Sequence, residues 1–309
     1  MAIKHETTEQ HGHIVDRLTD PETGIRIAVA RAGAELVSLA RRQLDHWTGF
    51  LYRDDDLSTP ASGWKNHSTV MGYYTHRIKN ERSLYRGHEI RGSTHSFLRL
   101  KTFAAPTFSA DRNSLTYHLA PESIEPHEYP LRVAFALEYA LREDTLRVTF
   151  RFHNEEPGLV AHVSFGLHPG FAATSLDSFE VLMPPGRYIQ HFAPGNFLSG
   201  ETAEIDFEGG PMPFRKDELL KSFLLEMKDV PVPIFVLSDR ESRRTVDLNF
   251  TGAPFVTLWS DGHPFVCVEP CWGLPDHHEQ RPFEKKAGIE EIAPGATLER
   301  SITMAPRLL

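Results

Sequence analysis

The stretch LRVAFALEYALREDTLRVTFRFH, residues 131–153, decides the fold because its large apolar residues recur at every second position. They occupy alternate positions from Leu131 to Leu141 and again from Leu146 to Phe152, and the polar REDT separates the two runs. A period of two places such side chains on one face of a β-strand. A short polar connection between two such runs is typical of a hairpin. The stretch therefore predicts a β-hairpin with one face in a hydrophobic core.

Similar strand signals recur along the chain, usually separated by Gly, Pro, Asp or Asn: IRIAVA, AELVSLA, SFLRLKTFAA, SLTYHLA, PIFVLSD, TVDLNF and PFVTLWS. One segment, RKDELLKSFLL from Arg215, predicts a helix with Leu219, Leu220 and Phe223 on one side. Residues 41–75 lack strong periodicity and predict a loop over the rim of a sheet. Because repeats, low-complexity tracts and Gly/Ser linkers are missing, we expect one all-β antiparallel sandwich domain, residues 1–309, with few short helices.

Composition excludes several classes of protein. The chain has 309 residues and a formal net charge of -9 without a basic stripe, which argues against a nucleic-acid partner. Its N-terminus lacks the apolar core of a secretory signal, and no apolar run approaches membrane-spanning length. The only cysteines, Cys267 and Cys271, are too close in an extended segment for an unstrained disulfide. We therefore expect a cytoplasmic protein with reduced thiols. The sequence does not decide between a monomer and a homodimer.

Ionisable residues punctuate three strand-like segments. Glu269 lies in FVCVEPCWG, residues 265–273, where an unpaired buried carboxylate would be expensive. His168 ends the apolar run of VSFGLHPGF, and His95 precedes the apolar residues of STHSFLRLKTF. Either a cation or a ring of donors holds Glu269 in a structural role, or its strand ends at a cleft where a carboxylate acts. Each histidine by itself is a common feature of a core or rim.

Together and in this order, these segments resemble the aldose 1-epimerase (galactose mutarotase-like) family. The similarity includes AGAELVSL, PFVTLWSDG and FEKKAGIEEIAPGATLERSITM, and spans about residues 25–304. The resemblance implies one large β-sandwich, the β-supersandwich, with a carbohydrate cleft on the concave face of a sheet. It also implies roles: Glu269 as general base, His168 as general acid, His95 as a ligand near the ring oxygen, and Arg77 in YYTHRIKN as a ligand of sugar hydroxyls.

The chemistry of such a reaction needs one base and one acid. Removing the proton from the C1 hydroxyl of an aldose and protonating its ring oxygen opens the ring, and rotation followed by reclosure gives the other anomer. Glu269 as carboxylate and His168 as imidazolium suit these two steps, and a positive His95 or Arg77 would stabilise developing charge. No metal, nucleotide or other cofactor is needed. The expected partner is a small carbohydrate. Trp272, Trp64, Tyr73 and Tyr74 are candidates for stacking on a pyranose ring.

The sequence departs from the common family pattern at three positions. Ser96 follows His95 where the family usually has glycine, and its side chain would narrow the cleft or donate a hydrogen bond. Cys271 follows Pro270 where a tryptophan is frequent, with Trp272 one place later, which puts the stacking role of Trp272 in doubt. Tyr73 stands where many sugar-specific members have an arginine. These departures leave the preferred sugar undecided.

Three functions from different classes stay open. An aldose mutarotase is favoured, since the acid and base positions are both filled. A carbohydrate-binding protein that lost turnover is the second reading. A glycoside hydrolase or lyase is the third, although it would normally need a second carboxylate facing the scissile bond. A mutarotase of a phosphorylated hexose is a variant of the first, because a group of arginines leaves room for it: Arg77, Arg82, Arg86, Arg91 and Arg99. Solvated positions on a hairpin are the favoured explanation of these arginines.

Overall fold

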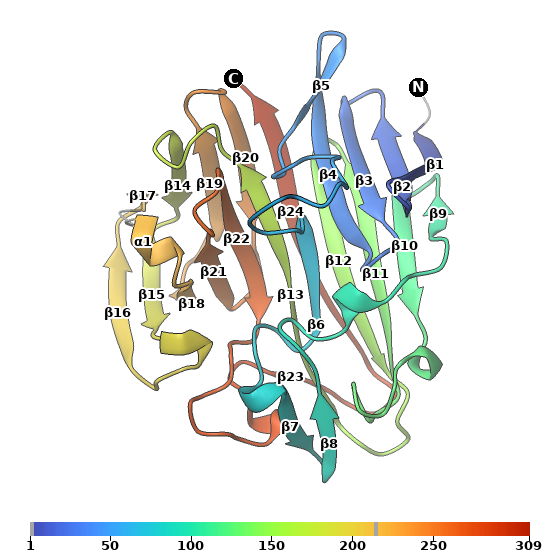
Figure 1. Cartoon of the computed structure of the whole chain (residues 1–309), viewed down its shortest axis with the longest axis vertical. Helices are drawn as coiled ribbons and strands as arrows, with labels where there is room; N and C mark the ends of the chain where they lie inside the picture. Colours follow the sequence, from blue (N-terminus) through green and yellow to red (C-terminus); the bar gives the residue numbers. More distant parts are fainter. Residues whose placement is uncertain (1–2, 213–215) are drawn as a thin grey trace.

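The protein is built mostly of antiparallel β-strands, and the computed structural model describes residues 3–212 and 216–309 (Figure 1). The N-terminal sheet has the spatial order β1 (Lys4–Gln10), β2 (His13–Asp20), β3 (Ile25–Ala30), β4 (Glu35–Gln43) and β5 (His46–Gly49). A small ribbon pairs β7 (Arg82–Tyr85) with β8 (His88–Arg91).

Two larger sheets make the body of the molecule. The β12 sheet has the order β17 (Gly210–Pro211), β14 (Phe179–Met183), β19 (Ile234–Asp239), β20 (Arg244–Asn249), β24 (Thr297–Leu308), β12 (Thr145–Asn154), β11 (Val133–Arg142), β10 (Ser114–Leu119) and β9 (Thr107–Ser109). The β13 sheet has the order β16 (Thr202–Phe207), β15 (Gly186–His191), β18 (Phe223–Asp229), β21 (Phe255–Trp259), β22 (Phe265–Trp272), β13 (Ala161–Ala172) and β23 (Glu290–Ile292), and β6 (Ser68–Tyr73) also pairs with β13.

The predicted all-β fold is confirmed, and the hairpin read from residues 131–153 is its centre. Strands β11 and β12 pair from Val133 opposite Asn154 to Arg142 opposite Thr145, as alternation of apolar residues indicates. Apart from the strands, the described residues form one helix and short 3₁₀ segments: α1 (Lys216–Leu219), η1 (Lys79–Glu81), η2 (Leu98–Leu100), η3 (Pro121–Ser123), η4 (Pro194–Asn196) and η5 (Phe283–Lys285).

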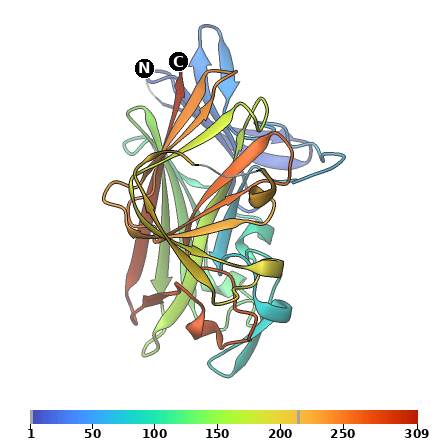
Figure 2. The ribbon, with the colours of Figure 1, turned by 90° about the vertical axis from the view of Figure 1, so that its left-hand side faces the viewer.

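The β12 and β13 sheets pack face to face around the main core, and the turned view shows their strands as layers (Figure 2). Phe150 and Phe152 of β12 contact Phe165 of β13, with ring centroids 5.4 and 4.8 Å apart. Trp272 of β22 stacks on Phe165 at 4.9 Å. These aromatic contacts bury large apolar surfaces, which is the main stabilising contribution of a sandwich core. The opposite face of the β13 sheet is therefore free for other side chains.

The predicted helix from Arg215 is mostly wrong. Arg215 lies outside the described residues, the helix α1 covers only Lys216–Leu219, and Phe223 begins strand β18. Leu219 is buried whereas Leu220 is 53% exposed, so the apolar residues do not share one buried side. Strand β18 pairs with both β15 and β21. These backbone hydrogen bonds within a sheet outweigh a weak local preference for helix.

The aperiodic region 41–75 is shorter in the structure than its sequence suggests, because β4 continues to Gln43, β5 follows, and β6 begins at Ser68. Both cysteines are buried and unpaired. Among the residues that the structure describes, no helix is long and apolar enough to cross a membrane.

Candidate active site

A row of polar side chains crosses neighbouring strands of the β13 sheet. Thr69 of β6 lies opposite His168 of β13, and Thr257 of β21 lies opposite Glu269 of β22. The pairs Gly166–Cys271 and Gly170–Cys267 then place His168 opposite Glu269. Residues directly opposite in an antiparallel pair have close side chains on the same face. The row therefore brings together residues separated by up to 200 positions.

Alternation along each strand directs this row away from the main core. Val163, Phe165 and Leu167 belong to that core, so His168 points to the other face of β13. In β22, Val268 and Trp272 face the core, and Glu269 again faces the opposite side. The same pattern that produced the buried sheet therefore presents an imidazole and a carboxylate on its outer face.

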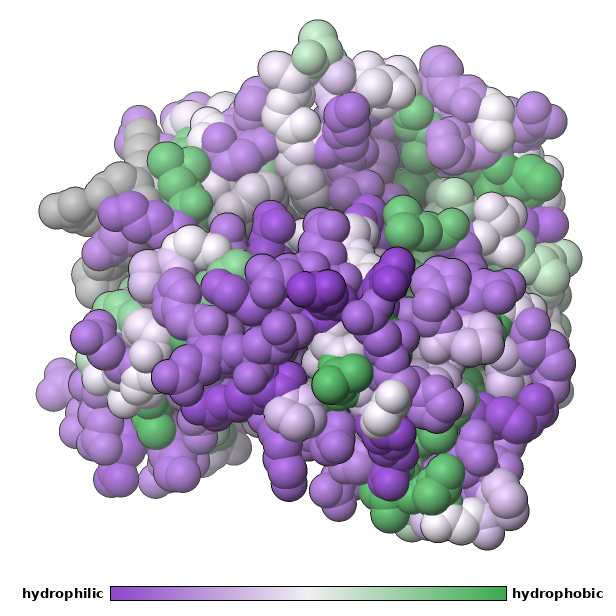
Figure 3. Space-filling model, turned by 60° about the horizontal axis from the view of Figure 1, so that its bottom comes forward, coloured by the Kyte–Doolittle hydropathy of each residue, from purple (hydrophilic) through white to green (hydrophobic). Residues whose placement is uncertain are grey.

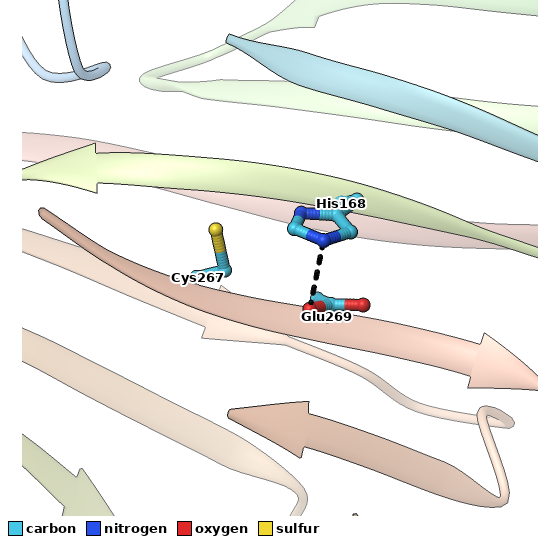
Figure 4. A group of neighbouring side chains, drawn as sticks. All are labelled: His168, Cys267 and Glu269. Atoms are coloured by element: carbon cyan, nitrogen blue, oxygen red, sulfur yellow. Dashed lines mark ion pairs between the residues drawn. The ribbon is translucent and has the colours of Figure 1, made fainter. Parts of the chain in front are cut away.

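His168 and Glu269 form a buried ion-pair contact, with Nε2 of His168 3.2 Å from Oε1 of Glu269 (Figure 4). Their exposed fractions are 6% and 2%. Among the described residues, no lysine or arginine lies within ion-pair distance of Glu269. A buried Lys or Arg therefore does not hold this carboxylate in a structural role. The two groups contact each other directly, since two desolvated polar groups gain from pairing.

Burial controls protonation of this pair. It raises the pKa of Glu269 well above the ordinary glutamate value and lowers the pKa of His168 to about 4. Both shifts disfavour a net charge in a site with little water. The contact between the groups favours a shared proton, whether this proton resides on the ring or on the carboxyl group. We therefore treat the pair as holding one proton and no net charge near neutral pH.

His95 lies beside His168, with ring centroids 5.2 Å apart at a nearly perpendicular angle. The backbone N–H of His76 donates to Nδ1 of His95 at 3.2 Å, and the backbone N–H of His95 donates to the carbonyl oxygen of His76 at 2.7 Å. Burial, with a smaller effect from nearby cations, lowers the pKa of His95 well below its ordinary value. His95 is therefore neutral rather than positive, and because Nδ1 accepts, its Nε2 carries the proton and can donate.

Two tryptophans form an aromatic wall at this pair. Trp64 stacks on His168 with ring centroids 5.0 Å apart, and Trp259 meets the same imidazole edge-on at 5.5 Å. The backbone N–H of Trp64 donates to Oδ2 of Asp261 at 2.7 Å, which ties the 50–67 loop to the turn before β22. Gly170 makes this packing feasible, because a Cβ there would lie 2.4 Å from the Trp64 ring. The wall excludes water from one side of His168.

The row borders a cavity of about 320 Å³. Of the residues predicted from the sequence, His168, Glu269, His95 and Arg77 line it. Several lining residues were not predicted as site residues: Asn66, Thr69, His76, Thr94, Ala193, Asn196, Lys221, Ser222, Leu224, Thr257, Trp259 and Pro275. Thr257 and Trp259 alternate with core residues in PFVTLWS, so the period of two together with the position of Glu269 could have identified them.

Trp272 was predicted to bind sugar, but the structure places it away from the cavity. Its side chain is fully buried against Phe165, and its indole N–H donates to the carbonyl oxygen of Gly252 at 2.8 Å. The reason is parity: Trp272 is three residues beyond Glu269, and odd spacings along a strand point to opposite faces. Trp64, also named from the sequence, occupies the cavity wall instead.

The departures from the family pattern also have structural outcomes. Tyr73 is fully buried, and its hydroxyl donates to the carbonyl oxygen of Val133 at 2.6 Å, so it takes no part in the cavity. Cys271 packs in a small separate cluster with Met71 and Leu274. Ser96 has φ 63°, a left-handed conformation that favours glycine, and its buried hydroxyl has no hydrogen-bond partner among the described residues. The serine therefore neither narrows the cavity nor donates a hydrogen bond.

One cluster has the residue types of a metal site. Donor atoms of His168, Cys267 and Glu269 lie within 4.8 Å of one another, and all three residues are buried (Figure 4). Structural zinc sites usually have four ligands, with cysteine as thiolate. Burial and the neighbouring Glu269 carboxylate raise the pKa of the Cys267 thiol well above its usual range, which disfavours the thiolate. Among the described residues the cluster therefore has neither the fourth ligand nor the thiolate of a structural zinc site.

Comparisons with known proteins agree with this architecture. The sequence model of a family described as aldose 1-epimerase matches residues 17–305. The chain is similar to the structure of a galactose mutarotase related enzyme from Lactobacillus acidophilus, at 20% identity and a TM-score of 0.82, covering 98% of this chain and 97% of that one.

Two further structures have the same fold. A galactose mutarotase-like protein from Lactobacillus casei is 20% identical, with a TM-score of 0.78, and the match covers 98% of this chain and 100% of that one. A galactose mutarotase-like protein from Clostridium acetobutylicum is 14% identical, with a TM-score of 0.75 and coverage of 100% and 99%. No curated protein matches the sequence. At these identities the structural likeness establishes the fold, not the substrate.

Proposed function

Since this chain belongs to the aldose 1-epimerase family, we propose that it is a mutarotase, which interconverts the α and β anomers of an aldohexose or related sugar by acid–base ring opening. The observation that carries the proposal is the buried contact between Glu269 and His168 at the cavity wall. A carboxylate and an imidazole that share one proton are the base and the acid that such a reaction requires.

In the proposed mechanism the sugar binds with its C1 hydroxyl at Glu269 and its ring oxygen at His168. Glu269 takes the hydroxyl proton while His168 gives a proton to the ring oxygen, and the bond between C1 and the ring oxygen breaks. The products are the open-chain aldehyde, a protonated Glu269 and a neutral His168. After rotation about the C1–C2 bond, His168 takes back its proton from the C5 hydroxyl and Glu269 returns its own to the aldehyde oxygen. The site therefore regains its starting protonation.

Other residues around the cavity support this chemistry. In this mechanism the neutral His95, whose ring centroid lies 5.2 Å from that of His168, donates a hydrogen bond from Nε2 to the ring oxygen. Trp64 and Trp259 limit water at His168, which strengthens electrostatic interactions at the reacting atoms. The two oxygens that exchange protons are bonded to one carbon, so an acid and a base on adjacent strands suit their separation.

The proposal is tested by following anomer exchange with NMR for a panel of free and phosphorylated aldoses, with and without the protein. Enhanced exchange for any of these sugars is expected, and it should be lost in His168→Gln. An exposed histidine outside the cavity, His118, provides the matched control variant His118→Gln. If no aldose exchanges faster while one still binds in calorimetry, the protein is a carbohydrate-binding protein and the mutarotase proposal is wrong.

A further inference from the structure

The cavity reverses the sign of charge that the chain has as a whole. The chain carries a formal net charge of -9. Among the described residues that line the cavity, the permanently charged side chains are Arg77, Arg99 and Lys221, against Glu269 as the only carboxylate. Because Glu269 is buried 3.2 Å from Nε2 of His168 and burial raises its pKa, this carboxyl group adds little negative charge to the cavity. The cavity therefore presents an excess of positive charge to whatever it binds.

In the part of the chain that the structure describes, neither arginine of this set has a carboxylate within ion-pair distance, and Glu35 interacts with Arg99 only at longer range. Nε of Arg99 donates to the carbonyl oxygen of Thr94, and Nη2 donates to the hydroxyl oxygen of Ser93, both at 2.9 Å. None of the ion pairs within residues 3–212 and 216–309 involves Arg77 or Arg99. The buried acid near Arg77, Asp276, is instead paired with Lys286, 3.3 Å from its Nζ. The Arg99 guanidinium is thus held by neutral acceptors, and among the described residues neither guanidinium is neutralised by an ion pair.

Their position relative to the catalytic pair is specific. Arg77 directly follows His76, whose backbone is hydrogen-bonded to both the backbone and the ring of His95. Arg99 is bonded back to Thr94, the residue that precedes His95. His95 in turn contacts His168. Arg77 and Arg99 therefore lie in the two segments that meet at His95, and both line the cavity.

On the basis of the mutarotase function, we propose that the substrate is an anionic aldopyranose whose charge lies on the C5 substituent. In a pyranose the ring oxygen is bonded to C1, the reacting carbon, and to C5. The substituent on C5 is therefore the group nearest to the ring oxygen apart from those on C1. A phosphate on C6 and a C6 carboxylate share this chemistry. Arginine recognises both, because its planar fork of N–H donors matches two anionic oxygens.

A neutral hexose would use this cavity poorly. Its hydroxyls would replace water around the half-buried Arg99 and the exposed Arg77 without supplying the negative charge that compensates a cation whose water the bound sugar displaces. The other arginines of the same sequence region do not weaken the inference, because Arg82, Arg86 and Arg91 lie at the β7–β8 ribbon and do not line the cavity. Much of the surface in the view of Figure 3 is hydrophilic with small separate apolar groups.

The experiment compares kcat/KM for anomer exchange between neutral and anionic sugars on the full chain. Glucose and galactose are the neutral probes, their 6-phosphates are the first anionic arm, and glucuronate and galacturonate are the second. We expect one anionic arm to exceed the neutral sugars by about 10-fold or more, as for a hydrogen bond to a charged group. The advantage should shrink as salt rises, because screening weakens it. Glucose 1-phosphate has no free anomeric hydroxyl and carries its charge on C1. Its inhibition constant should therefore be higher than the dissociation constant of glucose 6-phosphate.

Variants of Arg99, one of the two arginines that line the cavity, separate recognition from folding. Arg99→Gln should reduce the ratio of kcat/KM for the anionic sugar to that for the neutral sugar by about 10- to 100-fold. Arg99→Lys, which keeps the charge, should restore part of this ratio. The matched control is Arg142→Gln, which removes a charge from an exposed arginine at the end of β11 and should leave the ratio unchanged. A purely structural role of Arg99 would lower both rates together and leave their ratio constant.

The outcomes distinguish this inference from the proposed function. If neutral hexoses exchange as fast as every anionic aldose, the anionic substrate is wrong while the mutarotase function stands. If no sugar exchanges but calorimetry shows glucose 6-phosphate or a uronate binding more tightly than glucose in an Arg99-dependent manner, the mutarotase function is wrong while the anion site stands. An unchanged sugar ratio in Arg99→Gln would also overturn the inference.

Discussion

Replacing Glu269 by glutamine tests whether this buried carboxylate is catalytic or structural. Gln keeps the size of the side chain and its capacity to hydrogen-bond with Nε2 of His168, 3.2 Å away, but it cannot accept a proton. A positioned general base typically contributes 10²- to 10⁴-fold, so we expect turnover to fall by about 100-fold or more. At about 1.4 kcal/mol per factor of ten, this is a loss of roughly 3 kcal/mol or more of transition-state stabilisation.

The same substitution should change stability little. Glu269 is 2% exposed and has no lysine or arginine partner among the described residues, so Gln leaves no buried cation uncompensated. The change weakens one hydrogen bond, worth about 1 kcal/mol, and removes a carboxylate whose burial is itself unfavourable. A cost of this size shifts the melting temperature of a chain this large by about 2–4 °C at most.

Two measurements on one variant therefore suffice. NMR exchange gives the rate, and a calorimetric melt gives the stability. Exchange near the wild-type rate would refute the role of Glu269 as base. A loss of about 3–5 kcal/mol in unfolding free energy, with activity falling in proportion, would instead indicate that the carboxylate compensates a buried cation.

The remaining predictions concern protonation, packing and a buried ion pair. The pH profile of kcat/KM should be a bell that is wider than that of an ordinary Glu–His pair. Burial lowers the pKa of His168 to about 4, so the pair gains a second proton only at low pH. Burial raises the pKa of Glu269, so the pair loses its last proton only at high pH. A rate that falls as pH rises through about 6.5, the ordinary histidine pKa, would contradict this. Trp64→Leu should open His168 to water, raise KM and move the acid limb of the pH profile upward towards the ordinary histidine pKa. Trp272→Phe should instead lower the free energy of unfolding by on the order of 1–3 kcal/mol and leave KM unchanged, because the Trp272 ring lies in the core. Lys286→Met should cost about 3–5 kcal/mol in a denaturant titration because it strands the buried carboxylate of Asp276, and adding Asp276→Asn should recover part of the loss.

Period-two alternation carried much of what could be predicted. It identified the hairpin of residues 131–153, and in VSFGLHPGF it separates Phe165 and Leu167 from His168. Similarity to the family then indicated His168, Glu269, His95 and Arg77, all of which the structure places at one cavity. Parity would also have excluded Trp272, which shares a face with Val268 rather than with Glu269.

Local preference failed where neighbouring strands decide the conformation. The leucines after Arg215 have the spacing of a helix, yet Phe223 begins a strand that hydrogen-bonds to β15 and β21 on its two sides. Likewise, nothing in the spacing of the arginines distinguishes Arg99 from Arg91. Arg99 bends back to Thr94 and lines the cavity, while Arg91 pairs with Glu89 at the ribbon.

The sequence by itself determined which residues alternate between the two faces of each strand, because this follows from the geometry of a single extended chain. This alternation predicted an antiparallel sandwich. It also showed that the carboxylate of Glu269 lies in an otherwise apolar strand, where burial without a partner would be unfavourable. Only the tertiary structure decided that β13 and β22 are neighbours in the register that sets His168 opposite Glu269, about a hundred residues apart in the chain. That register depends on backbone hydrogen bonds and core packing contributed by many distant residues, so no local pattern encodes it. The burial that shifts both pKa values arises from the loops that cover this face, and it too exists only in the folded chain.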